Sequence, residues 1–229
     1  MNLSICTAIW KRPELTRFVL DYYVQMDHDL IVAFSDYKDW WPEGALAVYA
    51  DNEPLGAKWN AAVRTSQMFG ADAVMIVGSD DLVSPDYIKH ALRLIERGAD
   101  VVQPAGCWFV ELSSGEAFFH PIRTGAGRVV SRRLLELLDW KLWPDYATIR
   151  LDGEMDKVVA TVPHRAIQSD VGRVVDLKSG ENMWSYSNIW HMCGKPKLKT
   201  WVEALAPFGP MSRILDYPHF TNDLNITAL

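Results

Sequence analysis

The chain has 229 residues, a formal net charge of −6 and 49% hydrophobic residues. This length and composition predict one globular domain with a substantial core, and they exclude an intrinsically disordered chain. The acidic balance argues against a broad electrostatic surface for nucleic acid, although a local basic groove stays compatible with it.

The cysteines and the N-terminal sequence indicate the cellular compartment to expect. Cys6, Cys107 and Cys193 are widely spaced and odd in number, which favours reduced thiols over a disulfide framework or a zinc site. No apolar run has the length of a membrane span, and the first strand begins without a basic region or a cleavage site. We therefore expect a cytoplasmic protein without a transmembrane segment.

The first half alternates short apolar runs, typical of strands, with segments of helical periodicity. Strands are expected at residues 3–9, 30–34, 46–49, 73–77 and from 101 onward. Helices are expected from Pro13, over about 55–69 and over about 85–97, with glycines closing the last two. This alternation predicts an α/β fold with a mostly parallel central sheet flanked by helices.

The second half has a different pattern. Residues 107–112 and 117–119 predict a hairpin that turns on Gly115, and a helix is expected over 128–138. A further short helix follows Asp152-Gly153, and the tail from Lys195 reads as irregular with one short helix near Val202. Since no internal repeat or linker occurs, we expect a single domain over residues 1–229.

The most informative segment is the end of the strand at 73–77. It runs into Gly78-Ser79-Asp80-Asp81, and Ser84-Pro85 then indicates a helix start. The carboxyl ends of strands are where open α/β sheets bind ligands. Two adjacent carboxylates repel each other, and a divalent cation bound to a phosphate is a common reason to hold them together. The alternative is that both aspartates only cap the next helix.

Five segments in order resemble the glycosyltransferase A-type fold and, within it, the inverting family 2. They are residues 7–13, Ser35-Asp36, 52–62, 70–81 and 151–156, so that the resemblance covers roughly Leu3 to Asp156. It implies a Rossmann-like domain in which about 1–104 bind a nucleotide sugar, whereas about 105–229 bind the acceptor and form a C-terminal wrap. Two positions depart from the family pattern: Gly78 replaces the first metal-motif Asp, and Leu151 replaces a Glu.

The resemblance implies transfer of a sugar from a nucleotide diphosphate sugar, with a UDP-sugar as the expected donor, to an acceptor hydroxyl. It implies Mn²⁺ or Mg²⁺ as the cofactor, bound by Asp80, Asp81 and His191, and Asp152 as the base of an inverting displacement. The expected contacts to the nucleotide sugar are Thr7, Ala8, Trp10, Arg12, Asp36, Gly56, Lys58, Asn60, Ser79, Asp80 and Lys178.

Several of these roles have simpler alternatives. Glu154 and Asp156 rival Asp152 as the base, and all three are also ordinary acids of a helix start. A lone His191 is more often structural. Lys178 lies in an expected polar loop over 176–182, where a surface lysine is the simpler interpretation. The glycines at 125–127 either expose amides to an anion or only form a turn.

Two other functions compete with glycosyl transfer. A nucleotidyltransferase usually has a glycine-rich loop after its first strand, which residues 7–13 lack, and a non-catalytic nucleotide-sugar-binding module would explain the two departures. The acceptor stays open between a polysaccharide, a lipid-linked sugar, a small molecule and a modified DNA base. Trp40, Trp41, Trp108, Trp143 and the arginines of 128–133 are the residues expected to hold such a base.

Overall fold

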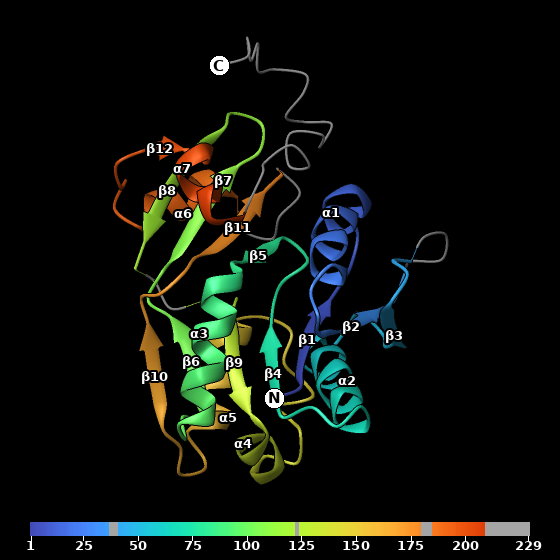
Figure 1. The fold of residues 1–229 in the computed structure, drawn as a ribbon. Helices are drawn as coiled ribbons and strands as arrows, with labels where there is room; N and C mark the ends of the chain where they lie inside the picture. Colours follow the sequence, from blue (N-terminus) through green and yellow to red (C-terminus); the bar gives the residue numbers. More distant parts are fainter. Residues whose placement is uncertain (37–40, 122–123, 180–184, 209–229) are drawn as a thin grey trace.

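The computed structural model describes residues 1–36, 41–121, 124–179 and 185–208. Trp40 and residues 180–182 of the expected phosphate loop lie outside these ranges. Within them, two sheets and their covering helices form a mixed α/β domain (Figure 1).

The larger sheet has the strand order β10-β6-β9-β4-β1-β2-β3. Its neighbours run parallel except β9, which is antiparallel to both β4 and β6. The mostly parallel sheet predicted from the sequence is therefore confirmed. Its strands are β1 (Leu3–Ala8), β2 (Asp29–Phe34), β3 (Ala45–Tyr49), β4 (Ala73–Ile76), β6 (Val101–Pro104), β9 (Arg128–Ser131) and β10 (Ala166–Ser169).

The smaller sheet has the order β12-β8-β7-β11-β5 and begins where β4 runs on into β5 (Figure 1). The predicted hairpin is confirmed as the antiparallel pair β7–β8. β11 joins this sheet between β7, to which it is parallel, and β5, to which it is antiparallel. The strands are β5 (Asp81–Val83), β7 (Cys107–Glu111), β8 (Glu116–His120), β11 (Val174–Lys178) and β12 (Lys199–Thr200).

Helices cover both faces of the larger sheet. Buried side chains of α1 (Pro13–Val24) and α3 (Pro85–Glu96) pack with Leu3 and Ile5 of β1, and their cluster continues into the smaller sheet. Side chains of α2 (Leu55–Met68), α4 (Arg132–Leu137) and α5 (Leu151–Val159) form a second cluster on the opposite face. The alternation of β1 side chains between the two clusters is what period-two geometry requires.

The remaining helices accompany the smaller sheet. α6 (Tyr186–Met192) lies near β7, and α7 (Trp201–Leu205), followed by a short 3₁₀ turn, packs on β7 and β8. The short helix predicted near Val202 is thus confirmed. Among the described residues, no helix combines the length and apolar character needed to cross a lipid bilayer.

Two sequence predictions were wrong at the level of elements. Residues 128–131, expected to begin a helix, form the buried strand β9, because two β-branched valines fit a central strand flanked on both sides. Residues 176–178, expected in a phosphate loop, complete β11, since the run Val174-Val175 continues with Leu177 on its buried positions.

Candidate active site

The turn between β4 and β5 brings two carboxylates to the carboxyl end of the larger sheet. The backbone N–H of Gly78 donates a hydrogen bond of 2.6 Å to Asp81 Oδ2. A Cβ on residue 78 would lie 2.6 Å from Asp81 Oδ2 and 2.9 Å from Asp80 Oδ1. Glycine therefore lets both carboxylates fold back over the turn, which gives the departure from the family pattern a local reason.

A third carboxylate comes from β11. The antiparallel register sets Asp176 directly opposite Asp81, and the N–H of Leu177 donates to the carbonyl of Asp80 at 2.8 Å. As a result, one carboxylate oxygen from each of Asp80, Asp81 and Asp176 lies within 4.8 Å of the other two. Asp176 is thus a member of the cluster that the sequence interpretation missed.

Two cations border this three-aspartate cluster. Arg12 Nη1 lies 2.8 Å from Asp80 Oδ2, and Nη2 donates to Ser79 Oγ at 2.8 Å. Lys178 Nζ lies 2.7 Å from Asp176 Oδ2, with only 5% of the lysine side chain exposed. Three carboxylates against two cations leave a net negative site if all are ionised.

Burial and mutual repulsion change the protonation of the cluster. Burial, followed by the charges of Asp80 and Asp176, raises the pKa of Asp81 well above its usual range. Burial also raises the pKa of Asp176 to about 7, although Lys178 opposes this effect. Burial therefore favours the protonated form of both carboxyls.

The cluster fits a hard divalent cation. Asp176 Oδ1 is buried and has no hydrogen-bond partner among the described residues, whereas its Oδ2 pairs with Lys178. An unsatisfied carboxylate oxygen beside two further carboxylates is the donor set that Mg²⁺ or Mn²⁺ takes. Asp80, Asp81 and Asp176 are therefore the residues that could hold the metal.

His191, the third expected ligand, is not part of this cluster. It lies exposed in the last turn of α6, where its ring contacts that of Trp190 with centroids 5.1 Å apart. Its role as a ligand stays a prediction.

The carboxyl ends of β1 and β2 form the expected nucleoside side of the site. Trp10 is 45% exposed, and Lys11 Nζ lies 4.0 Å from the centroid of its ring. The N–H of Lys11 donates to Asp36 Oδ2 at 3.3 Å, which ties the two strand ends together. Ala8 ends β1 in a half-buried position, whereas Thr7 is fully buried and its hydroxyl has no hydrogen-bond partner in the described part of the chain.

Lys58 lies beneath these strand ends instead of facing outward. It is 1% exposed, and its Nζ donates to the carbonyl of Ile9 at 2.6 Å, to Ser35 Oγ at 2.9 Å and to Asn52 Oδ1 at 3.1 Å. Burial lowers the pKa of Lys58 to about 8. All three N–H groups of the ammonium are used by the protein, so Lys58 holds these loops together, and its contact with a nucleotide stays a prediction.

Gly56 and Asn60 also hold a loop. Asn60 is fully buried, and its side chain accepts from the N–H of Leu142 and donates to the carbonyl of Trp143 at 2.8 Å. The N–H of Gly56 donates to the carbonyl of Ala147 at 2.7 Å. These contacts fix the segment that leads into α5.

Asp152 lies in the first turn of α5, next to the glycine turn at 125–127. The residue is exposed, but its carboxylate faces inward: a Cβ on residue 125 would lie 2.3 Å from Asp152 Oδ1. This local burial raises the pKa of Asp152, whereas the N–H of Gly125 and the charge of Arg128 lower it. Of the two rival acids, Glu154 pairs with Lys157 and Asp156 with Arg128.

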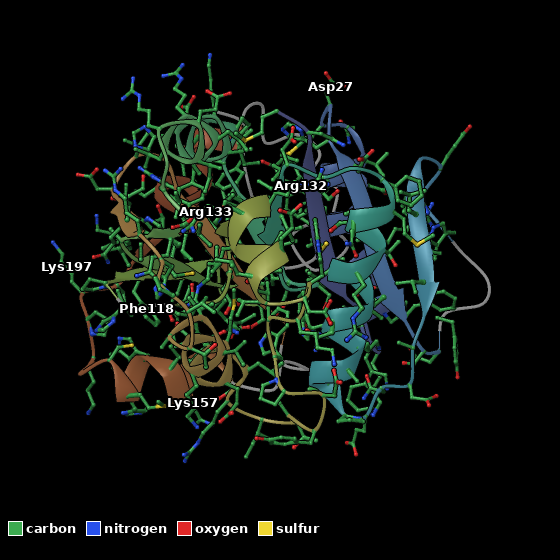
Figure 2. The ribbon with its side chains drawn as sticks, turned by 90° about the horizontal axis from the view of Figure 1, so that it is seen from below. Asp27, Phe118, Arg132, Arg133, Lys157 and Lys197 are labelled. Atoms are coloured by element: carbon green, nitrogen blue, oxygen red, sulfur yellow. The ribbon has the colours of Figure 1, made fainter. Side chains whose placement is uncertain are left out.

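Three of the residues expected to hold a modified DNA base are buried. Trp108 and Trp143 are 8% and 4% exposed, and Arg128 is 1% exposed, so these three side chains are not free at the surface for a base, and the acceptor itself stays a prediction. Arg132 and Arg133 extend from α4 at the surface (Figure 2), where they pair with Glu136 and Asp100.

No protein-family model and no curated protein matches the sequence. Solved structures do resemble it. TarS 1-349 from S. aureus, in complex with UDP, has a TM-score of 0.56 at 12% identity over 95% of this chain and 67% of that chain. A197 from STIV has a TM-score of 0.50 at 13% identity, over 76% and 84%.

A third neighbour, from Desulfovibrio desulfuricans G20, is described as a candidate nucleotide-diphospho-sugar transferase. It has a TM-score of 0.45 at 11% identity, over 96% and 94% of the two chains. The architecture and the TarS likeness define the class of fold: a mixed α/β domain with a mostly parallel central sheet flanked by helices, similar in fold to TarS.

Proposed function

We propose that the protein is a metal-dependent glycosyltransferase that moves a sugar from a UDP-sugar to an acceptor hydroxyl, with inversion at the anomeric carbon. The observation that carries this proposal is the three-aspartate cluster at the carboxyl end of the larger sheet, with an unsatisfied oxygen on Asp176. The UDP in the TarS structure supports the choice of donor. The cytoplasm is the compartment that we propose, from the three widely spaced cysteines.

The proposed donor site uses the residues that border the cluster. Asp80, Asp81 and Asp176 would hold Mn²⁺ or Mg²⁺, which neutralises charge on the diphosphate when bound. Arg12 and Lys178 add fixed positive charge on either side of the cluster. The strand-end loops that Lys58 holds, with the exposed Trp10, would receive the nucleoside.

The proposed base is Asp152. As the acceptor oxygen bonds to the anomeric carbon, the bond from that carbon to the diphosphate breaks, and Asp152 takes the proton of the acceptor hydroxyl. Inversion follows if this displacement is direct. Asp152 suits this task because its carboxylate lies against Gly125, where burial raises the pKa of Asp152 and makes it a stronger base.

The test is turnover of UDP-, GDP- and TDP-sugars with and without Mn²⁺, for the wild type, Asp80→Ala, Asp152→Asn and the control Asp170→Asn on the surface. We expect slow Mn²⁺-dependent release of UDP that the control retains and the other two variants lose. If a nucleotide sugar binds tightly with Mn²⁺ but no donor is turned over with any acceptor tried, the protein is a non-catalytic nucleotide-sugar-binding module. If none of the nucleotide sugars binds to the protein, the proposal is refuted.

A further inference from the structure

Arg128 is an unusually buried charge close to the proposed base. It begins β9, opposite Ile76 of β4, and is 1% exposed. Its Nη1 lies 2.9 Å from Asp156 Oδ1. Its Nε and Nη2 have no hydrogen-bond partner among the described residues.

The ion pair with Asp156 does not account for this burial. Buried N–H groups of a charged side chain are costly when unpaired, so arginines that serve packing alone normally have them satisfied. Asp156 is 54% exposed and would be well solvated without Arg128. Burial of the guanidinium therefore lowers the stability of the folded protein, and its one ion pair offsets only part of this cost.

Arg128 contacts two neighbours of Asp152, one through its guanidinium and one through its backbone. Asp152 and Asp156 are one turn apart on the same face of α5, and Asp156 contacts the guanidinium. On the other side, Asp152 Oδ1 lies against Gly125, whose carbonyl accepts the N–H of Arg128 at 3.1 Å. The charged groups that face Asp152 are Arg128, which favours its ionised form, and Asp156, which opposes it.

We propose that Arg128 is a positioning residue of the transfer reaction, whose buried charge keeps Asp152 ionised and turned toward Gly125, ready to accept the acceptor proton. This inference rests on the proposed role of Asp152. Arg128 itself gains and loses no proton: the proton passes from the acceptor hydroxyl to Asp152 as the diphosphate leaves.

The test measures the protonation of Asp152 directly, by side-chain carboxyl NMR titration of the full chain, with its signal assigned as the one missing in Asp152→Asn. The variants are Arg128→Met, Arg128→Lys and Asp156→Asn. We expect Arg128→Met to raise the titration midpoint by about one pH unit, which is the size of effect that one nearby charge has. Arg128→Lys should stay near the wild type, and Asp156→Asn should move the midpoint down.

Melting temperature separates this role from packing. Arg128→Met removes unpaired buried N–H groups, so its melting temperature should equal or exceed that of the wild type. An unchanged Asp152 midpoint in Arg128→Met would overturn the inference, and so would a loss of stability without a shift of the midpoint. Full turnover by Asp152→Asn would instead refute the proposed base. If Asp152→Asn is inactive but the Asp152 midpoint of Arg128→Met is unmoved, the role of Arg128 alone is refuted.

Discussion

At the scale of single residues, Lys58 connects three segments of the chain. Its ammonium links the end of β1, the end of β2 and the segment before α2 through Ile9, Ser35 and Asn52. Because these segments form the expected nucleoside side of the site, a change at Lys58 affects stability and nucleotide binding together.

We predict that Lys58→Met lowers the free energy of unfolding by about 2 kcal/mol, since it leaves buried oxygens without donors while it removes the cost of a buried charge. UDP affinity should fall as well. Urea unfolding and calorimetric titration with UDP measure the two effects. The exposed Lys89→Met is the control, and equal stability of the two variants would contradict this account of Lys58.

Asp176 is the residue whose removal tests the metal cluster. Loss of a supporting partner alone typically weakens metal binding by 10–100-fold, so we predict that Asp176→Asn weakens Mn²⁺ binding by more than about tenfold. Titration calorimetry with MnCl₂ measures the affinity. The exposed Asp170→Asn should bind like the wild type, and similar affinity of both variants would exclude Asp176 as a ligand.

The raised pKa of Asp176, about 7, predicts a pH dependence of stability. Between the pKa of an unfolded Asp, about 4, and 7 the folded state holds more protons than the unfolded state. Metal-free stability therefore falls as pH rises through this window. Mn²⁺ competes with those protons, so the rise in melting temperature that it causes should be larger at pH 8 than at pH 5.5. An equal rise at both pH values would show that protons and metal do not compete there.

The sequence could reveal those site residues that are adjacent in the chain, but not those that strand pairing brings together. Asp80 and Asp81 are adjacent and follow a strongly apolar strand, so the sequence alone indicates them. Asp176 joins them through an antiparallel register with β5, and no local pattern predicts that pairing. The run Val174-Val175 before it was the available signal for a strand. Arg128 was hidden in the same way, because its burial depends on β4 and α5.

At the scale of secondary-structure elements, two helical glycines differ in how closely other segments pack against them. A Cβ on Gly56 in α2 would lie 2.2 Å from the carbonyl oxygen of Pro144, whereas a Cβ on Gly153 in α5 would meet nothing within 4 Å. The first glycine permits close approach of the loop before α5, and the second only weakens its helix.

We predict opposite effects of alanine at these positions. Gly56→Ala should destabilise the protein by about 2 kcal/mol through overpacking, and Gly153→Ala should stabilise it by about 0.5–1 kcal/mol through helix propensity. Thermal unfolding of both variants measures the difference. A destabilised Gly153→Ala, or a neutral Gly56→Ala, would contradict the packing described for these helices.

The elements that the sequence revealed are those with local signals. A proline gave the first residue of α1, a proline start and a glycine stop gave α3 nearly to the residue, and the hairpin β7–β8 followed from its turn. β9 was mistaken for part of a helix, because only four residues form it and α4 follows at once. Its burial between β4 and β6 decides its structure, and burial of this kind is a tertiary effect.

At the scale of the whole molecule, sequence periodicity predicts most of the larger sheet, but only the β7–β8 hairpin of the smaller sheet. Five strands of the larger sheet, β1, β2, β3, β4 and β6, follow from the strand–helix alternation of the first half, whereas β9 and β10 come from the second half. The smaller sheet joins β5, from the first half, to β7, β8, β11 and β12, all from the second. This union brings Asp176 to Asp80 and Asp81, so the proposed site exists only in the folded whole.

The central claim, that the three-aspartate cluster binds a metal and a nucleoside diphosphate together, is tested most directly by calorimetric titration of UDP with Mn²⁺ and with EDTA. We predict that UDP binds the wild type at least tenfold more tightly with Mn²⁺, and that Asp176→Asn abolishes this difference. Equal UDP binding with Mn²⁺ and with EDTA, or no UDP binding under either condition, would contradict the claim.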